Sequence, residues 1–319
     1  KFNNPLPSDE VSRIIADAYK SGGYKYKCSD DVLSHYCDSK CVLYRYKNLD
    51  ESSEVLSAEE MSEKLIQYMN TDFTDKSFDL KTVFPFMPQP YIFKAGQMAV
   101  LLGDTKLGKT AFWQYVITMI PQVKTLFMSL EVDDITMIRR FLQIGLQQNK
   151  DTISQSWETA DPKVIKAGIE KISHIKLLTS SPDLSAYPEL IQEHKPKIVV
   201  IDTIDMVPAR YAKNDELQKQ GYITSELKKI AMDQDVIILA VSHISKGASY
   251  RIAEGQGLDI HSGKGNSSLE QKADKIISFE GDRESSKRRV IRTLGSRDET
   301  GFEIVCNYDW DTFTFSKRN

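Results

Sequence analysis

The octapeptide Gly103-Asp104-Thr105-Lys106-Leu107-Gly108-Lys109-Thr110 is the most informative part of this sequence. A short apolar run leads into Gly103, and a stretch of helix-forming residues begins at Thr110. The octapeptide fits G-x-x-x-x-G-K-[ST], a loop between a strand and a helix whose backbone N–H groups point inward. The positive end of the helix dipole lies behind it. We therefore predict a phosphate loop in which all eight residues surround the phosphates of a nucleotide.

The residue types that close the phosphate loop suit a triphosphate with magnesium. Lys109 is expected to place its ammonium on the β- and γ-phosphates, and the Thr110 hydroxyl to be a ligand of Mg²⁺. ATP and Mg²⁺ are thus the expected cofactors. An ordinary glycine loop is the alternative, and the position between a strand and a helix argues against it.

Apolar runs on both sides of the loop are typical of strands that are buried on both faces. They lie at 98–102, 125–130, 198–201 and 236–241, separated by helical stretches at 110–120, 134–149 and 215–233. This order predicts an α/β fold with a parallel sheet between two layers of helices. Later runs follow closely, at 276–279, 290–294, 302–308 and 313–315. We expect these to be antiparallel strands added at the sheet edge.

Three polar residues stand at the ends of the predicted strands. Asp202 is expected to hold Mg²⁺, Glu131 to polarise the attacking water, and His243 to sense the γ-phosphate. The carboxyl ends of parallel strands meet at one edge of a sheet, so these side chains should gather at the phosphate loop. In the simpler alternatives Asp202 caps a turn, Glu131 begins a surface helix and His243 makes only a strand-end hydrogen bond.

In this order the motifs resemble those of DnaB-like replicative ring helicases, including bacteriophage primase–helicases. The segments that carry the resemblance are "GQMAVLLGDTKLGKTAF", "TLFMSLEVD", "KIVVIDTIDMV" and "VIILAVSHISKG". The resemblance runs from about residue 91 to the C-terminus. It implies a RecA-like P-loop NTPase core that hydrolyses ATP, moves on single-stranded DNA, and assembles into a homo-oligomer, expected to be a hexameric ring.

The segment "SRDETGFEIVCNYDWDTFTF" resembles the hairpin that carries the arginine finger of these helicases. On this match Arg297 reaches the γ-phosphate bound by the neighbouring subunit. The family usually has a lysine two residues earlier, where this chain has Gly295. Arg292 or Arg289 are candidates to replace that lysine. The alternative for Arg297 is a solvated charge at a hairpin turn.

Glycines and cations fill the stretch between the His243 strand and residue 276. In the resembling family this segment is a loop that faces the ring channel, so Lys246, Arg251 and Lys264 are expected to bind DNA phosphates without reading sequence. A solvent loop is the alternative. The chain has a net charge of −3, which argues against a protein that coats nucleic acid with a wholly basic surface.

The first 90 residues are expected to form two smaller parts ahead of an ATPase domain at 91–319. Residues 1–50 form a small helical segment whose Cys28, Cys37 and Cys41, with His35, are candidate zinc ligands or simply packed cysteines. This segment resembles the C-terminal linker of archaeo-eukaryotic-type primase–polymerases, which implies a primase fused to the chain or working with it. Residues 51–90 form a linker with one helix, which Ser57 and Glu60 are spaced to cap.

No apolar run reaches the length of about 18 residues that a membrane span requires. The resemblance to replicative helicases implies a cytoplasmic protein of a bacterial, archaeal or virus-infected cell. Two other function classes stay open. One is a RecA-type recombinase or DNA-organising ATPase that forms filaments without unwinding. The other is a regulatory or kinase-like P-loop enzyme that does not use DNA.

Overall fold

The computed structural model describes residues 56–70, 76–158, 162–210, 215–254, 256–264, 266–281 and 287–318. The chain divides into two compact units, Lys1–Thr71 and Asp72–Asn319. In the first, the described element is helix α4 (Ala58–Asn70). Its predicted capping box is confirmed: the Ser57 N–H donates to Glu60 Oε2 at 2.8 Å and the Glu60 N–H to Ser57 Oγ at 3.3 Å.

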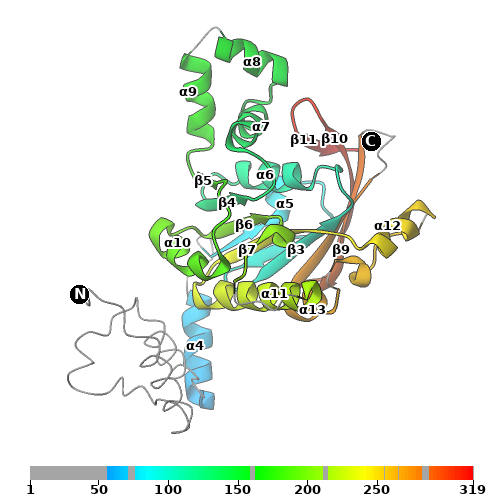
Figure 1. Cartoon of the computed structure of the whole chain (residues 1–319). Coiled ribbons are helices and arrows are strands. Elements are labelled where there is room, and N and C mark those ends of the chain that lie inside the picture. The colour runs from blue at the N-terminus through cyan, green and yellow to red at the C-terminus, as the bar shows by residue number, and fades with distance from the viewer. Residues whose placement is uncertain are drawn as a thin grey trace, which may run out of the picture. The chain divides into compact units, whose positions relative to one another are not determined.

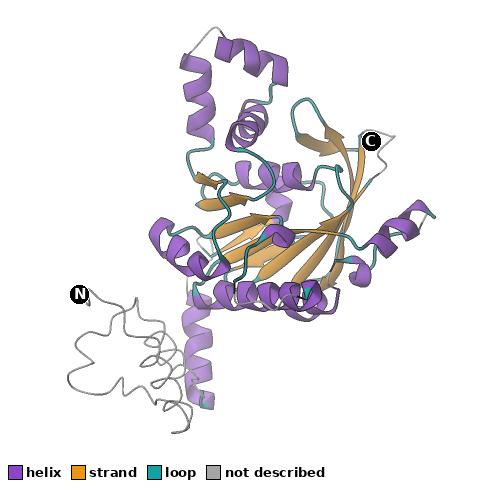
Figure 2. Cartoon of the chain, in the orientation of Figure 1, coloured by secondary structure: helices purple, strands orange, loops and turns teal. Residues whose placement is uncertain are grey.

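A nine-stranded sheet, in the order β11-β10-β9-β8-β3-β7-β6-β4-β5, organises the second unit (Figures 1 and 2). Its six parallel strands are β3 (Met98–Gly103), β4 (Thr125–Ser129), β5 (Ile175–Leu178), β6 (Ile198–Asp202), β7 (Ile237–His243) and β8 (Lys275–Glu280). The antiparallel strands are β9 (Arg288–Ser296), β10 (Glu303–Asp309) and β11 (Thr314–Lys317). The predicted α/β class with an antiparallel extension is confirmed.

Both faces of the sheet are covered, because strand residues alternate between two hydrophobic clusters. In β3, Ala99 and Leu101 belong to the first cluster, and Met98, Val100 and Leu102 to the second. The clusters are completed by apolar faces of helices: α6 (Lys109–Thr118) and α7 (Asp134–Leu146) on one side, and α10 (Tyr187–His194), α11 (Glu216–Asp233) and α13 (Asn266–Lys272) on the other. Helices α8 (Lys150–Glu158) and α9 (Pro162–Lys171) pack on α7.

Strand β8 corrects one expectation, because it is not part of the antiparallel extension. It lies parallel to β3, with Ala99 opposite Lys275, and the first antiparallel strand is β9. Its run is buried on both faces, like the runs of β3, β4, β6 and β7. The segment before β8 holds two helices, enough chain for the crossover that a parallel pair needs. Strand β5 was not expected, because its half-exposed residues give no uniform apolar run.

The segment before residue 91 also differs from the expected linker. Strands β1 (Ser77–Asp79) and β2 (Ile92–Lys94) pair as an antiparallel hairpin around helix α5 (Leu80–Val83). Phe78 and Phe84 are buried in the first hydrophobic cluster. The compact unit therefore begins near residue 72, and the expected boundary at 91 falls inside it.

The stretch expected as a flexible glycine-rich loop contains helix α12 (Lys246–Ala253). Ser245 caps this helix by accepting the Ala248 N–H at 3.2 Å. An antiparallel bridge between Ile244 and Gly263 joins the two ends of the segment that contains this helix. The stabilisation from the Ser245 cap exceeds the cost of Gly247 in the helix. Glycine content alone therefore predicted a loop where the chain forms a helix.

Candidate active site

The phosphate loop joins β3 to α6 with both of its glycines under constraint. Gly108 has φ 105°, and a Cβ there would lie 2.9 Å from the Tyr308 ring. A Cβ on Gly103 would lie 2.5 Å from the Phe279 carbonyl oxygen. No described side chain caps the start of α6, so its first N–H groups face the loop. The local sequence thus builds an anion-binding turn at the end of β3.

Lys109 holds its ammonium inside this turn. The side chain is buried, and Nζ donates to the carbonyls of Gly103 and Asp104, each at 2.8 Å. Burial lowers the pKa of Lys109, and the charges of Asp202 and Glu131 oppose that shift. A cation in this position is available to phosphate oxygens that enter the loop.

Asp202 and Thr110 meet at the end of β6. The Thr110 hydroxyl donates to Asp202 Oδ2 at 2.6 Å. Burial raises the pKa of Asp202 to about 6. Its other oxygen, Oδ1, is buried and has no hydrogen-bond partner among the described residues. A hydroxyl and a carboxylate with one buried, unpaired oxygen form a donor set that fits Mg²⁺.

Glu131 and His243 complete the cluster, and the strand register explains why. Gly103 lies opposite His243 in the β3–β7 pair, and Ser129 lies opposite Asp202 in the β4–β6 pair. His243 Nε2 is 3.1 Å from Glu131 Oε1, and its Nδ1 is 3.5 Å from Lys109 Nζ. The imidazole thus bridges the lysine of the phosphate loop and Glu131, which follows β4. The structure brings together the five side chains that the sequence singled out at this edge.

Asp205 belongs to the same cluster, although the sequence gave no reason to choose it. It lies in the short 3-10 turn Ile204–Met206 and accepts the His243 N–H at 3.1 Å and the Gln220 amide at 2.8 Å. Burial raises its pKa. The only signal was its place three residues beyond Asp202.

Arg289 also supports the phosphate loop. The sequence had made it a candidate to replace the lysine that is missing at position 295. It is fully buried, and its Nε donates to the Leu107 carbonyl at 2.9 Å. The guanidinium carbon lies 5.3 Å from the Tyr308 ring centre and 5.4 Å from that of Trp310. A side chain enclosed in this way cannot reach a neighbouring subunit, so Arg289 is not a substitute for the lysine missing at Gly295.

Arg297 lies away from this cluster. It follows β9, and its N–H donates to the Asp274 carbonyl at 3.0 Å, beside the start of β8. Because β8 is parallel to β3, this is the sheet edge opposite Gly103. The side chain is 52% exposed. Arg292, the other candidate, is paired with Glu280 at 2.8 Å.

The three cations expected to bind DNA lie beyond His243, and two of them have acidic partners. Arg251 pairs with Asp259 at 3.2 Å, and Lys264 pairs with Glu216 at 2.6 Å. Lys246 is exposed at the start of α12. The Lys264 N–H donates to the His243 carbonyl at 3.0 Å, which joins this region to the active-site cluster.

The predicted zinc ligands Cys28, His35, Cys37 and Cys41 lie outside the described residues. Within the described ranges, no group of three or more His, Cys, Asp or Glu side chains is arranged to hold a metal ion. In the same part of the chain, no helix combines the length and the apolar character that crossing a membrane takes.

Known proteins resemble both the sequence and the fold of this chain. Replicative DNA helicase DnaB of Treponema pallidum (strain Nichols) is 23% identical over 214 residues, 62% of this chain and 47% of the relative. The chain therefore spans about half the length of that relative.

Two solved structures share the fold. One, an ATPase domain, is 18% identical with a TM-score of 0.70, over 83% of this chain and 100% of that one. A DnaB-like replicative helicase, described with its interactions with primase, is 16% identical with a TM-score of 0.69, over 98% and 77%. The expected RecA-like core is thus confirmed. Residues 91–300 match the DnaB-like helicase C terminal domain, which is more than half of the chain. The chain therefore belongs to the family of DnaB-like helicase C-terminal domains.

Proposed function

We propose that this chain is the ATP-hydrolysing motor of a replicative helicase that moves along single-stranded DNA. The observation that carries the proposal is the convergence of Lys109, Thr110, Asp202, Glu131 and His243 at one edge of the sheet. Membership of the family supports it. A phosphate loop alone binds nucleotide, whereas a metal-binding acid beside a second acid also provides for hydrolysis.

The residues of the cluster divide the work of phosphoryl transfer among them. The N–H groups at the start of α6 and the Lys109 ammonium bind the β- and γ-phosphates. Thr110 and Asp202 would hold Mg²⁺, which would supply positive charge to the phosphates. Glu131 orients the attacking water. His243, bridging Glu131 and Lys109, responds when the γ-phosphate leaves.

Arg297 acts on the nucleotide of a neighbouring subunit. Its place at the sheet edge opposite the phosphate loop supports this, because a residue there cannot serve its own chain's site. Each complete site then needs two copies of the chain. We propose that the copies form a hexameric ring, so that every interface holds one nucleotide.

DNA binding follows from the connection between His243 and the α12 region. Hydrogen bonds join His243 to Lys264 and Ser245 to Ser262, so a change at the imidazole reaches this segment directly. Lys246 offers an exposed cation to a phosphate, and Arg251 and Lys264 bind DNA after releasing their acidic partners. Contacts to phosphate suit a motor that must step over every base, because the backbone is the same at each step.

Three predictions about the wider protein remain proposals. A primase is fused to this chain or works with it, and the relative described with its interactions with primase supports this. Zinc is held by Cys28, Cys37, Cys41 and His35, which lie outside the described residues. The protein acts in the cytoplasm, where it meets replicating DNA.

The decisive measurement is the rate of ATP hydrolysis with and without single-stranded DNA. Lys109→Ala should abolish hydrolysis, whereas Lys124→Ala, which removes an exposed lysine outside the cluster, should leave it unchanged. Wild-type activity in Lys109→Ala would contradict the site. Stimulation by DNA is expected, and a DNA-independent rate would contradict the motor.

A recombinase-like ATPase remains the second candidate, and electron microscopy with ATP and DNA distinguishes it. Closed rings support the helicase, and helical filaments the recombinase.

A further inference from the structure

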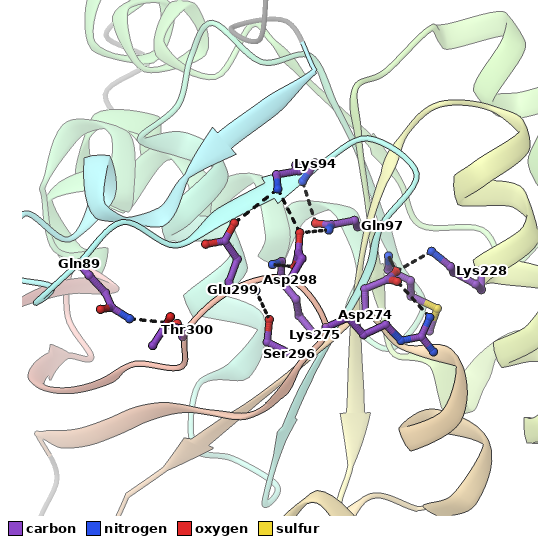
Figure 3. A network of polar contacts seen from close by, with 12 residues as sticks. Gln89, Lys94, Gln97, Lys228, Asp274, Lys275, Ser296, Asp298, Glu299 and Thr300 are labelled. Atoms are coloured by element: carbon purple, nitrogen blue, oxygen red, sulfur yellow. Dashed lines mark hydrogen bonds and ion pairs between the residues drawn. The ribbon is translucent and has the colours of Figure 1, made fainter. Parts of the chain in front are cut away.

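A polar network lies at the sheet edge opposite the phosphate loop and holds the turn that carries Arg297 (Figure 3). Asp298, the next residue, is its centre. The Asp298 carboxylate accepts hydrogen bonds from Lys275 Nζ at 2.6 Å, Gln97 Nε2 at 2.7 Å and Lys94 Nζ at 3.2 Å. The turn is thereby attached to β2, to the residue just before β3 and to β8 at once.

Lys275 is the unusual member, because its side chain is completely buried. Its Nζ lies 4.8 Å from the ring centre of Tyr91 and 5.9 Å from that of Phe93. Burial lowers the pKa of Lys275, and the hydrogen bond with Asp298 opposes that shift. An ammonium removed from water in this way needs a carboxylate partner, and Asp298 is placed to be that partner.

Asp274 holds the same turn at a second point, through the backbone of Arg297 itself. Its Oδ2 accepts the Met98 N–H at 2.8 Å and Lys228 Nζ at 2.7 Å, and its carbonyl accepts the Arg297 N–H. The Arg297 guanidinium lies only 3.5 Å from Asp274 Oδ1 and remains half exposed. The base of Arg297 is therefore fixed at two adjacent points, and its guanidinium, which also donates to the Gln271 carbonyl, must leave these acceptors to reach a neighbouring subunit.

We propose that Asp298, through its ion pair with the buried Lys275, is a positioning residue for Arg297, whose target is the nucleotide of a second copy of this chain. The inference rests on the proposed role of Arg297 between subunits. An arginine that meets a phosphate across an interface must start from a fixed backbone, since a misplacement of about 1 Å is enough to lower a catalytic rate by about 100-fold. Asp298 fixes that backbone without contacting the nucleotide itself.

The first test is Asp298→Asn, which keeps the shape of the side chain and removes its charge. The turnover number for ATP should fall at least about tenfold, while the KM for ATP stays within about twofold, because the variant's own phosphate loop is intact. Asp233→Asn, an exposed acid at the end of α11, is the matched control and should match the wild type. Loss of affinity for ATP with an unchanged turnover number would overturn the proposal.

A second variant covers the case in which Asp298→Asn does not fold because Lys275 is left without a counter-charge. The double change Lys275→Met and Asp298→Asn removes both charges and keeps an apolar chain beside Tyr91. It should unfold at or above the wild-type temperature and still show the reduced turnover number, because the attachment of the turn is lost. A folded double variant with wild-type turnover would overturn the proposal.

Mixed oligomers separate positioning from damage to the variant's own site. Asp298→Asn subunits co-expressed with Lys109→Ala subunits form interfaces that combine an intact phosphate loop from the first with an intact Arg297 from the second. Basal ATPase activity per oligomer should exceed that of either variant alone.

Arg297→Ala mixed with Lys109→Ala is the reference for this experiment. If the reference recovers activity and the Asp298→Asn mixture does not, Asp298 is not a positioning residue, while Arg297 keeps its role. If the reference itself fails to recover, the role of Arg297 between subunits is wrong, and this inference is overturned with it.

Discussion

Replacing Asp202 by asparagine should change how the stability of the metal-free protein depends on pH. Burial raises the pKa of this carboxyl from 3.8 to about 6, an effect that the Thr110 hydrogen bond only partly opposes. Between these two pH values the folded state keeps a proton that the unfolded state has released. The cost of ionising Asp202 therefore grows as the pH rises through this window and is constant above it. A difference of about two pKa units corresponds to about 3 kcal/mol.

The assay is unfolding of wild type and Asp202→Asn in a chelator, from pH 4.5 to 7.5. The stability of the variant relative to wild type should increase by about 2 kcal/mol over this range, because the remaining part of the cost has already developed below pH 4.5. For a unit of this size that is a relative shift of about 4–8 °C in Tm. Costs of the asparagine amide that do not depend on pH cancel in the comparison. Stability curves that run parallel would refute the reasoning, and Asp233→Asn should give such parallel curves.

Three further outcomes follow from the same contacts. Gly108→Ala should weaken nucleotide binding by at least about tenfold, because Gly108 has a positive φ and an added Cβ would lie 2.9 Å from Tyr308. Gly247→Ala is the control and should leave binding unchanged, because no atom lies within 4 Å of its added Cβ. Calorimetry with a non-hydrolysable nucleotide measures both affinities. Arg289→Met should weaken that binding too, since the Leu107 carbonyl loses its donor, and wild-type affinity would mean that the loop needs no support from β9. Lys246→Ala should reduce the salt dependence of single-stranded DNA binding by about 0.7 in log–log slope, and an unchanged slope measured by fluorescence anisotropy would remove Lys246 from the DNA contacts.

The sequence was enough for the parts of the site that depend on local pattern. The octapeptide at 103–110 predicts a loop between a strand and a helix. Asp202 and His243 each end an apolar run, and the parallel arrangement of the two strands brings their side chains to the same edge of the sheet. The prediction failed for β8, which was expected to be antiparallel, because an apolar run does not reveal whether a strand runs parallel or antiparallel to its neighbour. It also missed α12, where one capping serine outweighed a glycine-rich composition.

Arg289 and Asp298 were beyond sequence reasoning for a different reason. Arg289 contacts Leu107, 182 residues away, and Asp298 contacts Gln97, 201 residues away. Each has an ordinary surface residue type with no local pattern around it. Their importance comes from burial and from partners that only the folded sheet brings near. Residues that support a site are in general harder to predict than residues that form it, because the latter must satisfy fixed chemistry.

Strand β9 carries Arg289 near one terminus and leads into Arg297 at the other. The two residues are eight steps apart along the chain, a span of at most about 26 Å. In the proposed assembly, one end of β9 contacts the phosphate loop of its own subunit through Arg289. The other end leads into Arg297, which acts on the nucleotide of the neighbouring subunit. Support for one nucleotide site and action on the next then depend on a single strand of the sheet.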